Sequence, residues 1–202
     1  SVTGVVMGKY LAMLTVFALP TAIACLCPLI IALNGSSFLL ADYGSILAFF
    51  LLGAVQIAVG EFISSLTDNQ GFAAGIGIAV ILLNYYSVSL SESVSSTAFG
   101  SIIALAVLLV ILWFVIRYLT RNEKLAWGVC LPLYAAMMIT AWVDNTRFEG
   151  LLPSIMTNLS LFERFYTFVN GVFDMTGIVY YLSVIAFFLF LSVQSLEKRR
   201  YN

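Results

Sequence analysis

The chain has 202 residues, of which 62% are hydrophobic and only 9% are charged, and its formal net charge is −1. Because a soluble domain carries roughly 25% charged residues, too little polar sequence remains here to cover a soluble core. No basic domain is present, so the charge gives no reason to expect a nucleic-acid partner. The composition predicts a protein embedded in a membrane.

Six stretches are apolar enough to cross a bilayer, which takes about 20 residues of helix. Lipid offers no hydrogen bonds to the backbone, so each span must be helical. We therefore predict an all-α fold, a polytopic membrane helical bundle that forms one transmembrane domain over residues 1–202. The predicted spans are Lys9–Leu33, Gly44–Ser64, Gly71–Leu90, Ser101–Leu119, Leu125–Val143 and Ile178–Leu196.

The basic residues lie mostly on one side of these spans. Six spans place both chain ends on the same side of the membrane, and that side carries most of the Lys and Arg residues. The positive-inside rule then predicts that both ends are cytoplasmic. The basic residues on that side are Lys9, Arg117, Arg121, Lys124, Lys198, Arg199 and Arg200, whereas only Arg147 and Arg164 lie on the other.

The first span contains Pro20 and Pro28. Each proline removes a helical hydrogen bond and bends the helix, either as a packing kink or as a hinge for conformational change. The sequence begins at Ser1 and enters an apolar run almost at once, with no signal-peptide pattern before it. We expect a fragment whose upstream part is missing.

The second span contains Gln56 and Glu61. An ionisable group in a membrane span indicates a functional site by default. Glu61 lies about one turn from the predicted cytoplasmic end, where water or headgroups can reach it, so an interfacial role stays open beside a role in transport. Both residues are predicted polar points of a substrate path.

A short cytoplasmic turn with Asp68, Asn69 and Gln70 follows, and these three residues are predicted to line the cytoplasmic entrance. Asp68 is expected to cap the next helix.

The third span carries small residues at a spacing of four, which favours close approach by another helix. These residues are Gly71, Gly75 and Ala79. Asn84 is a buried amide on the same span, and we expect it to bond to a neighbouring helix. A contact with substrate is the alternative for Asn84, which is therefore the third predicted polar point of the path.

The fourth and fifth spans form a hairpin through a basic turn at residues 117–124, which would lie against anionic headgroups. Residues 144–177 are predicted to be extracytoplasmic. Within them, Ser160 and Glu163 form a capping box that opens a helix. Its apolar stripe predicts an amphipathic helix, either passive at the membrane surface or acting as an outer gate. The stripe comprises Phe162, Phe165, Tyr166, Val169, Val172 and Phe173.

Motifs for catalysis are missing from the sequence. There is no phosphate-binding P-loop, no zinc-protease motif and no nucleophile elbow. The chain contains no histidine and three cysteines, which makes a zinc site improbable. We predict that the chain is not an enzyme and holds no cofactor or metal of its own.

The last part of the chain carries a distinctive pattern. An aromatic-rich helix at 162–168 precedes a Gly-Val-Phe-Asp turn at 171–174, a Tyr-Tyr-Leu-Ser segment at 180–183 and Lys-Arg-Arg at 198–200. This pattern resembles the C-terminal region of bacterial ABC-type (type 2) export permeases, most closely the gliding-motility-type permease subunits. Residues 1–9 resemble the segment that follows the coupling helix of that family, and residues 68–74 resemble the start of one of its spans.

This resemblance implies a permease subunit of an ATP-binding-cassette exporter in a bacterial cytoplasmic membrane. It implies a partner ATPase subunit that binds ATP and Mg²⁺, and a second permease copy or a related permease. The family has two further spans and a coupling helix before the position that corresponds to Ser1. The hairpin Ser101–Val143 is extra relative to the shortest family members.

Two other classes stay open at this stage. An ion-gradient-driven secondary transporter or channel needs buried ionisable groups, and Glu61 is the only acid predicted inside the bilayer. A membrane scaffold without transport activity is the third possibility.

Overall fold

The computed structural model is helical throughout its regular structure, with no strand in the part of the chain that it describes. It describes residues 1–35, 38–93, 97–120 and 123–200, without the side chains of residues 115, 118–120, 145, 147 and 200. Arg121, one of the basic residues used to predict the topology, therefore lies outside the described residues.

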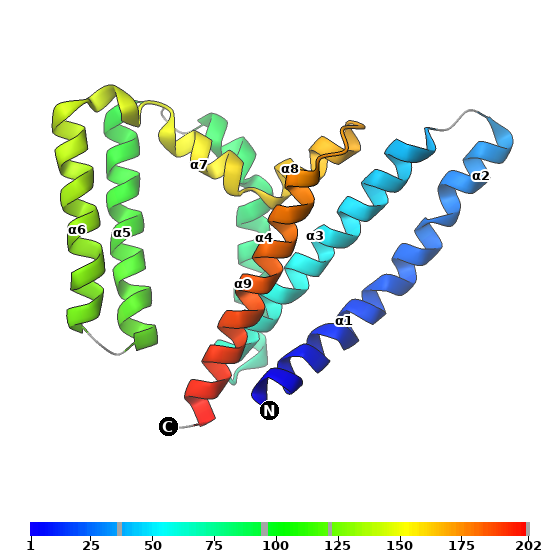
Figure 1. Cartoon of the computed structure of the whole chain (residues 1–202), viewed down its shortest axis with the longest axis horizontal. Helices are drawn as coiled ribbons and strands as arrows, with labels where there is room; N and C mark the ends of the chain where they lie inside the picture. The colour runs from blue at the N-terminus through cyan, green and yellow to red at the C-terminus, as the bar shows by residue number, and fades with distance from the viewer. Residues whose placement is uncertain (36–37, 94–96, 121–122, 201–202) are drawn as a thin grey trace. The chain divides into compact units, whose positions relative to one another are not determined.

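The chain divides into two compact units (Figure 1). Unit 1 comprises Ser1–Tyr85 and Leu161–Asn202, and unit 2 comprises Tyr86–Ser160. The prediction of a single transmembrane domain over 1–202 stays a prediction. The elements of unit 1 are α1 (Val2–Ala24), α2 (Leu26–Asn34), α3 (Leu39–Leu66), the first part of α4 (Gln70–Ser93), α8 (Leu161–Val169) and α9 (Met175–Arg200).

The centre of unit 1 is α3, which packs against α9, α8 and α1. Figure 1 shows α9 running beside α3, with both chain termini at the same end of this unit. The main core joins one face of α3 to α8 and α9 and contains Leu51, Leu52, Val55, Val59, Ile63, Leu161 and Tyr181. A smaller core joins α1, α3 and α9 and contains Val6, Tyr10, Ala58 and Leu189.

The first predicted span is interrupted at Cys25, between α1 and α2. Pro28 lacks the amide hydrogen that would bond to the carbonyl of Ala24, and this lost hydrogen bond lies at the break. The hydroxyl of Tyr43 on α3 donates to the carbonyl of Cys25 at 3.1 Å, directly at the break. Pro20, in contrast, lies inside α1 without ending it. A break between α1 and α2 thus accompanies Pro28 and none accompanies Pro20, while the predicted bend stays a prediction.

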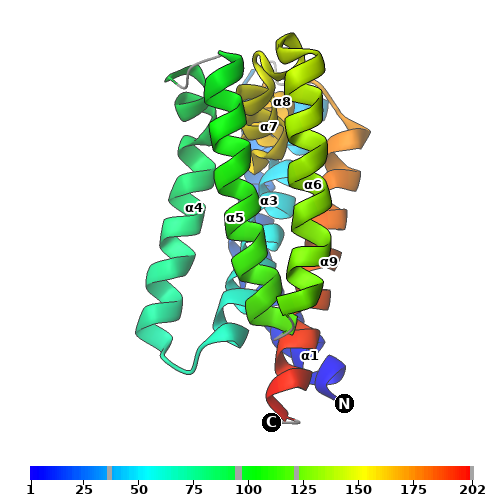
Figure 2. The same cartoon turned by 90° about the vertical axis from the view of Figure 1, so that its left-hand side faces the viewer.

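Unit 2 is built on a helical hairpin. Figures 1 and 2 both show α5 (Ala98–Thr120) and α6 (Glu123–Val143) side by side. The 3₁₀ helix η1 (Asn145–Phe148) and α7 (Leu151–Leu159) follow them. A small core of Ala98, Met137 and Phe148 holds α5, α6 and η1 together. The predicted hairpin at Ser101–Val143 is thus confirmed as a pair of packed helices.

Among the described residues, five helical segments are long and apolar enough to cross a membrane: Val2–Asn34, α3, α4, α6 and Met175–Arg199 of α9. The sixth predicted span coincides with α5, whose described apolar segment, Ala98–Phe114, is shorter. Large apolar side chains on these helices are widely exposed, as a lipid-facing surface requires. These features indicate a membrane protein.

The segment that was predicted to hold one amphipathic helix contains two short helices, α7 and α8. Helix α8 begins at Leu161, directly after Ser160 as predicted, but it ends at Val169 rather than extending to Phe173. Gly171 has a φ of 82°, a left-handed conformation that glycine adopts without steric cost and that ends the helical path. Val172 and Phe173 therefore belong to the connection before α9.

The contact between α1 and α3 depends on one glycine. The ring of Phe17 lies directly over Gly53, where a β-carbon would clash with it. The same ring stacks on Phe50, with centroids 5.9 Å apart and planes 13° apart. Gly53 is thus the position at which α3 admits an aromatic side chain of α1.

We predict that Gly53→Ala destabilises the solubilised protein by about 1–3 kcal/mol, because the added methyl group displaces Phe17 from a packed position. Gly60→Ala on the same helix is the matched control, since a β-carbon there meets nothing within 4 Å. Thermal unfolding of both variants in detergent measures the difference. Equal stability of the two variants would contradict the packing of α1 on α3.

Candidate functional site

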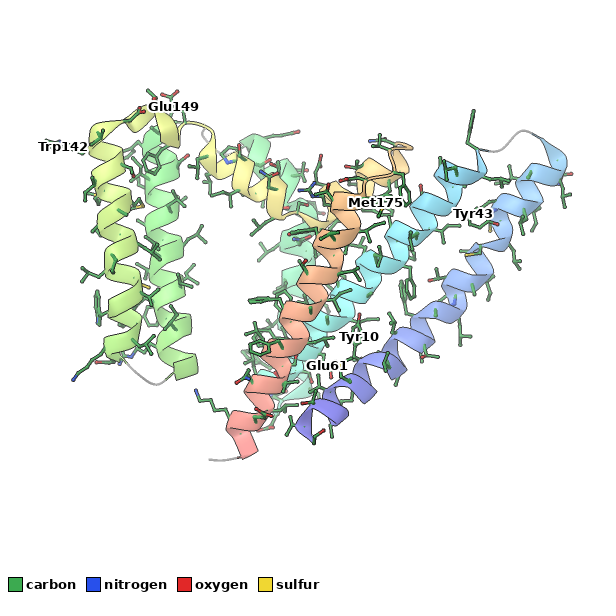
Figure 3. The ribbon with its side chains drawn as sticks, viewed as in Figure 1. Tyr10, Tyr43, Glu61, Trp142, Glu149 and Met175 are labelled. Carbon is green, nitrogen blue, oxygen red and sulfur yellow. The ribbon has the colours of Figure 1, made fainter. Side chains whose placement is uncertain are left out.

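Glu61 is buried within unit 1. Its residue is 7% exposed, and neither carboxylate oxygen has a hydrogen-bond partner among the described residues. Figure 3 shows Glu61 on α3 at the same level as Tyr10 on α1. The Tyr10 hydroxyl does not donate a hydrogen bond to the carboxylate of Glu61, because it donates to the carbonyl of Ala54 at 3.3 Å. The neighbouring helices thus cover Glu61, and the choice between an interfacial role and a role in transport stays open.

Gln56 lies one and a half turns before Glu61 on the same helix and is half-buried. Its side-chain nitrogen is buried and has no hydrogen-bond partner among the described residues. A buried amide donor and a buried carboxylate acceptor are thus both unsatisfied within α3. Leaving each group unpaired costs about 1–3 kcal/mol or more, which makes this stretch of α3 the candidate site.

Asn84 does bond to a neighbouring helix, as predicted. Its side-chain oxygen accepts from the backbone N–H of Leu161 at 3.1 Å, at the start of α8. The carbonyl of the same residue accepts from the hydroxyl of Tyr181 on α9 at 2.7 Å. We call these three residues the Leu161 anchor. It satisfies one of the free N–H groups at a helix start and fixes α8 to both α4 and α9.

Further contacts hold the other end of α8 and the connection to α9. The hydroxyl of Ser45 on α3 donates to the carbonyl of Phe168 at 3.3 Å. Arg164 lies 3.8 Å from a carboxylate oxygen of Asp174, and its guanidinium lies 5.6 Å from the ring centre of Tyr180. Asp174 also accepts from the backbone N–H of Thr176 at 2.9 Å and so caps α9. Helix α8 is therefore bonded to other helices of unit 1 at both of its ends.

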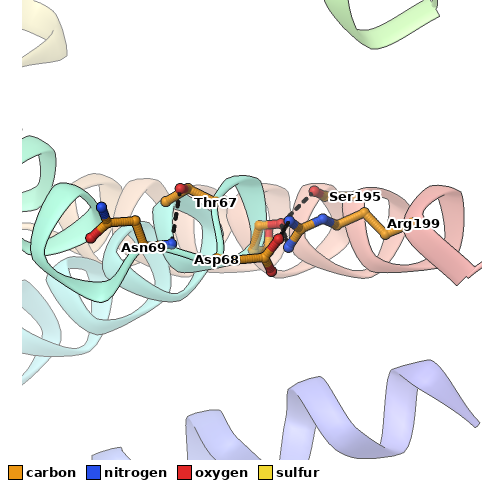
Figure 4. Close-up of polar contacts among 6 residues, drawn as sticks. Thr67, Asp68, Asn69, Ser195 and Arg199 are labelled. Carbon is orange, nitrogen blue, oxygen red and sulfur yellow. Dashed lines mark hydrogen bonds and ion pairs between the residues drawn. The ribbon is translucent and has the colours of Figure 1, made fainter.

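The turn between α3 and α4 is tied to the end of α9 (Figure 4). Asp68 and Arg199 form an ion pair at 2.6 Å. Arg199 also donates to the carbonyl of Ser65 at 3.3 Å, and the hydroxyl of Ser195 donates to the same carbonyl at 3.1 Å. We call this group the Arg199 clasp. The ion pair is largely exposed, so it contributes less than about 1 kcal/mol by itself, but the bonds to Ser65 fix the last turn of α3.

The residue that was predicted to cap α4 is wrong by one position. The side-chain oxygen of Asn69, not of Asp68, accepts from the N–H of Phe72 at 3.1 Å. Asp68 is turned toward Arg199 instead, because a carboxylate gains more from a cation than from an amide. Gln70 is exposed at the first position of α4. Of the three residues predicted at the cytoplasmic entrance, two are thus engaged in local structure.

The small residues of α4 do not bring another helix close in this structure. Gly71 and Ala79 are exposed, and a β-carbon at Gly75 would meet nothing within 4 Å. The prediction of close helix packing at this face finds no partner within the described chain and stays a prediction. Spacing alone identified a face that can pack without identifying a partner for it.

The sequence did not reveal the contacts that Tyr181, Ser195 and Arg199 make in the structure. Ser195 and Arg199 are four residues apart and therefore share one face of the last helix, which is a signal that the sequence did contain. Tyr181 gave no comparable signal, because its partner is a backbone carbonyl 20 positions away. In the described part of the chain, no group of three or more His, Cys, Asp or Glu residues is placed to hold a metal ion.

Comparisons of this chain with protein-family models, with curated proteins and with solved structures find no match.

We predict that Tyr181→Phe destabilises the protein by about 0.5–1.5 kcal/mol, because it removes the buried hydrogen bond from the tyrosine hydroxyl to the carbonyl of Leu161. Hydrogen exchange should also become faster in α8, whose first turn loses its connection to α9. Tyr134→Phe is the control, since Tyr134 is 47% exposed on α6. If both variants match the wild type in stability and in α8 exchange, the Leu161 anchor does not hold α8.

Proposed function

We propose that this chain is the membrane-spanning permease subunit of an ATP-binding-cassette exporter, driven by a separate ATPase subunit. The observation that carries the proposal is that α3, packed against α9, holds two polar side chains inside the unit. Those of Gln56 and Glu61 have buried atoms without a hydrogen-bond partner among the described residues. A helical wall with unpaired polar groups suits a path for a solute. The resemblance of the C-terminal region to export permeases supplies the transporter class.

The proposal sets the chain in a bacterial cytoplasmic membrane with six spans and both ends cytoplasmic. Lys9 and the Arg199 clasp would then lie on the cytoplasmic side, where positive charge is expected. Lipids surround the apolar helices, and a second permease copy, or a related permease, completes the path. ATP and Mg²⁺ are bound by the partner ATPase rather than by this chain.

In this proposal the site residues have different tasks. Gln56 and Glu61 are the polar points of the path. Asn84 anchors α8, because its side-chain oxygen is engaged by Leu161. Asp68 belongs to the link through which the turn between α3 and α4 can act on α9. A push on the cytoplasmic turns by the ATPase would thus reach the core helices through a bonded connection, and would bias a two-state packing change.

One observation favours a second function, an ion-gradient-driven transporter or channel. Glu61 is a buried carboxyl group without a partner, which is the kind of group that such proteins use to carry ions or protons. The two functions differ in their energy source and therefore in the partner that they require.

We expect the full-length protein to co-purify with a P-loop ATPase in a fixed ratio when native membranes are solubilised in mild detergent, as mass spectrometry of the purified assembly will measure. The assembly should also hydrolyse ATP. Purification of a variant with a disrupted Walker lysine in that ATPase is the control, since it keeps the assembly and loses the hydrolysis.

A stable, monodisperse preparation that contains no ATPase would contradict the exporter proposal. It would favour the gradient-driven transporter, which needs no such subunit.

A further inference from the structure

The carboxyl group of Glu61 is in a setting that disfavours its ionised form. It is more than nine-tenths buried, and no described group donates a hydrogen bond to either oxygen. An ionised carboxylate without donors is costly in such surroundings, and the group takes up a proton instead. We propose that Glu61 is a proton-binding site, neutral while α1 is packed on α3 and ionised once that contact opens.

The surroundings of Glu61 fit a proton better than a metal ion. Ala58, one turn earlier on α3, belongs to the apolar core formed with Val6, Tyr10 and Leu189. A bound Ca²⁺ or Mg²⁺ requires about six oxygen ligands. No group of acidic, His or Cys side chains that could supply them exists among the described residues. A single carboxyl group in an apolar contact can bind only a proton well.

The charged and titratable groups around Glu61 leave it unpaired. On α1, Lys9 and Tyr10 are within electrostatic range, but Lys9 is exposed and Tyr10 is bonded to Ala54. On α9, Arg199 is engaged by Ser65 and Asp68. The other titratable groups that the structure describes on the elements packed against α3 are the amine of Ser1 at the start of α1, Glu197 and Lys198 near the end of α9, Tyr180 and Tyr181 near its start, Glu163, Arg164 and Tyr166 on α8, and Cys25 and Cys27 at the start of α2.

Helices α1 and α9 both contribute to the core beside Glu61, but α9 also belongs to the larger core of unit 1, so α1 is the helix that withdraws more readily. Helix α1 ends at the break before Pro28, and it meets α3 through the smaller of the two cores of unit 1. When α1 withdraws, water reaches the carboxyl group, which ionises at neutral pH as exposed glutamates do. For α1 to pack on α3 again, the Glu61 carboxylate must first bind a proton. This coupling between the protonation of Glu61 and the packing of α1 needs no ATPase partner. It goes beyond the permease function proposed above.

Infrared spectroscopy of the full-length protein in lipid vesicles at neutral pH tests the protonation directly. We expect the C=O band of a protonated carboxylic acid, and we expect Glu61→Gln to lose it. Lys9→Met should keep the band, since Lys9 is not paired with Glu61. The proposal is overturned if the wild type lacks this band, or if the band survives in Glu61→Gln. A band that appears only in Lys9→Met would show instead that Lys9 keeps Glu61 ionised.

Cysteine labelling tests the link to the packing of α1. Val6 is fully buried against α3 and α9, so Val6→Cys in a cysteine-free background reports opening of the contact to a water-soluble maleimide. We expect the labelling rate to rise with pH when Glu61 is present and to stay constant with pH in Glu61→Gln, after correction for the reactivity of a free thiol. The same pH dependence in both backgrounds would overturn the link between the proton and the contact.

Discussion

The packing of α3 against α9 is the contact on which the rest of unit 1 depends. It buries one face of α3 over several turns, from Leu51 to Ile63, and a fully buried tyrosine of α9. Between helices in lipid, association comes from close packing and hydrogen bonds rather than from a hydrophobic driving force. Such a contact must therefore be well fitted along its length, and its polar groups must be satisfied at its ends.

Both ends of this contact carry hydrogen bonds of that kind. At one end, Tyr181 donates to Leu161, which brings α8 and α4 onto the same core. At the other end, Ser195 and Arg199 donate to the carbonyl of Ser65 at the end of α3. Because hydrogen bonds hold α3 and α9 together at both ends, α1 is the helix of unit 1 that can move more readily. That helix meets α3 through Phe17 over Gly53 and through the smaller core beside Glu61.

The sequence predicted what depends on local pattern and failed where distant partners decide. Hydropathy located the long apolar helices, Pro28 located the break after α1, and the capping signal at Ser160 located the start of α8. The bond from Asn84 to a neighbouring helix was also foreseeable, because a buried amide needs a partner. Its particular partner, the N–H of Leu161, lies 77 positions away and could not be inferred.

The errors have the same origin. Asp68 was expected to cap α4, but it faces Arg199, 131 positions further along the chain. Glu61 was expected near water because it lies close to the end of its helix, whereas α1 and α9 pack beside it and leave the residue 7% exposed. Four-residue spacing pointed to Gly71 and Gly75, whereas the ring of Phe17 on α1 packs over Gly53, a position that has no such repeat. In each case the outcome depends on which helix packs alongside, which local sequence does not encode.

Cross-linking across α3 and α9 in native membranes tests this account most directly. The hydroxyl of Ser195 lies 3.1 Å from the carbonyl oxygen of Ser65, so a Ser65→Cys and Ser195→Cys pair in a cysteine-free background should cross-link efficiently. Ser65→Cys with Ser183→Cys is the control, because Ser183 lies about three turns away on α9. Selective cross-linking of the first pair is the predicted result. Absence of that cross-link, or equal cross-linking of both pairs, would contradict the packing of α3 against α9.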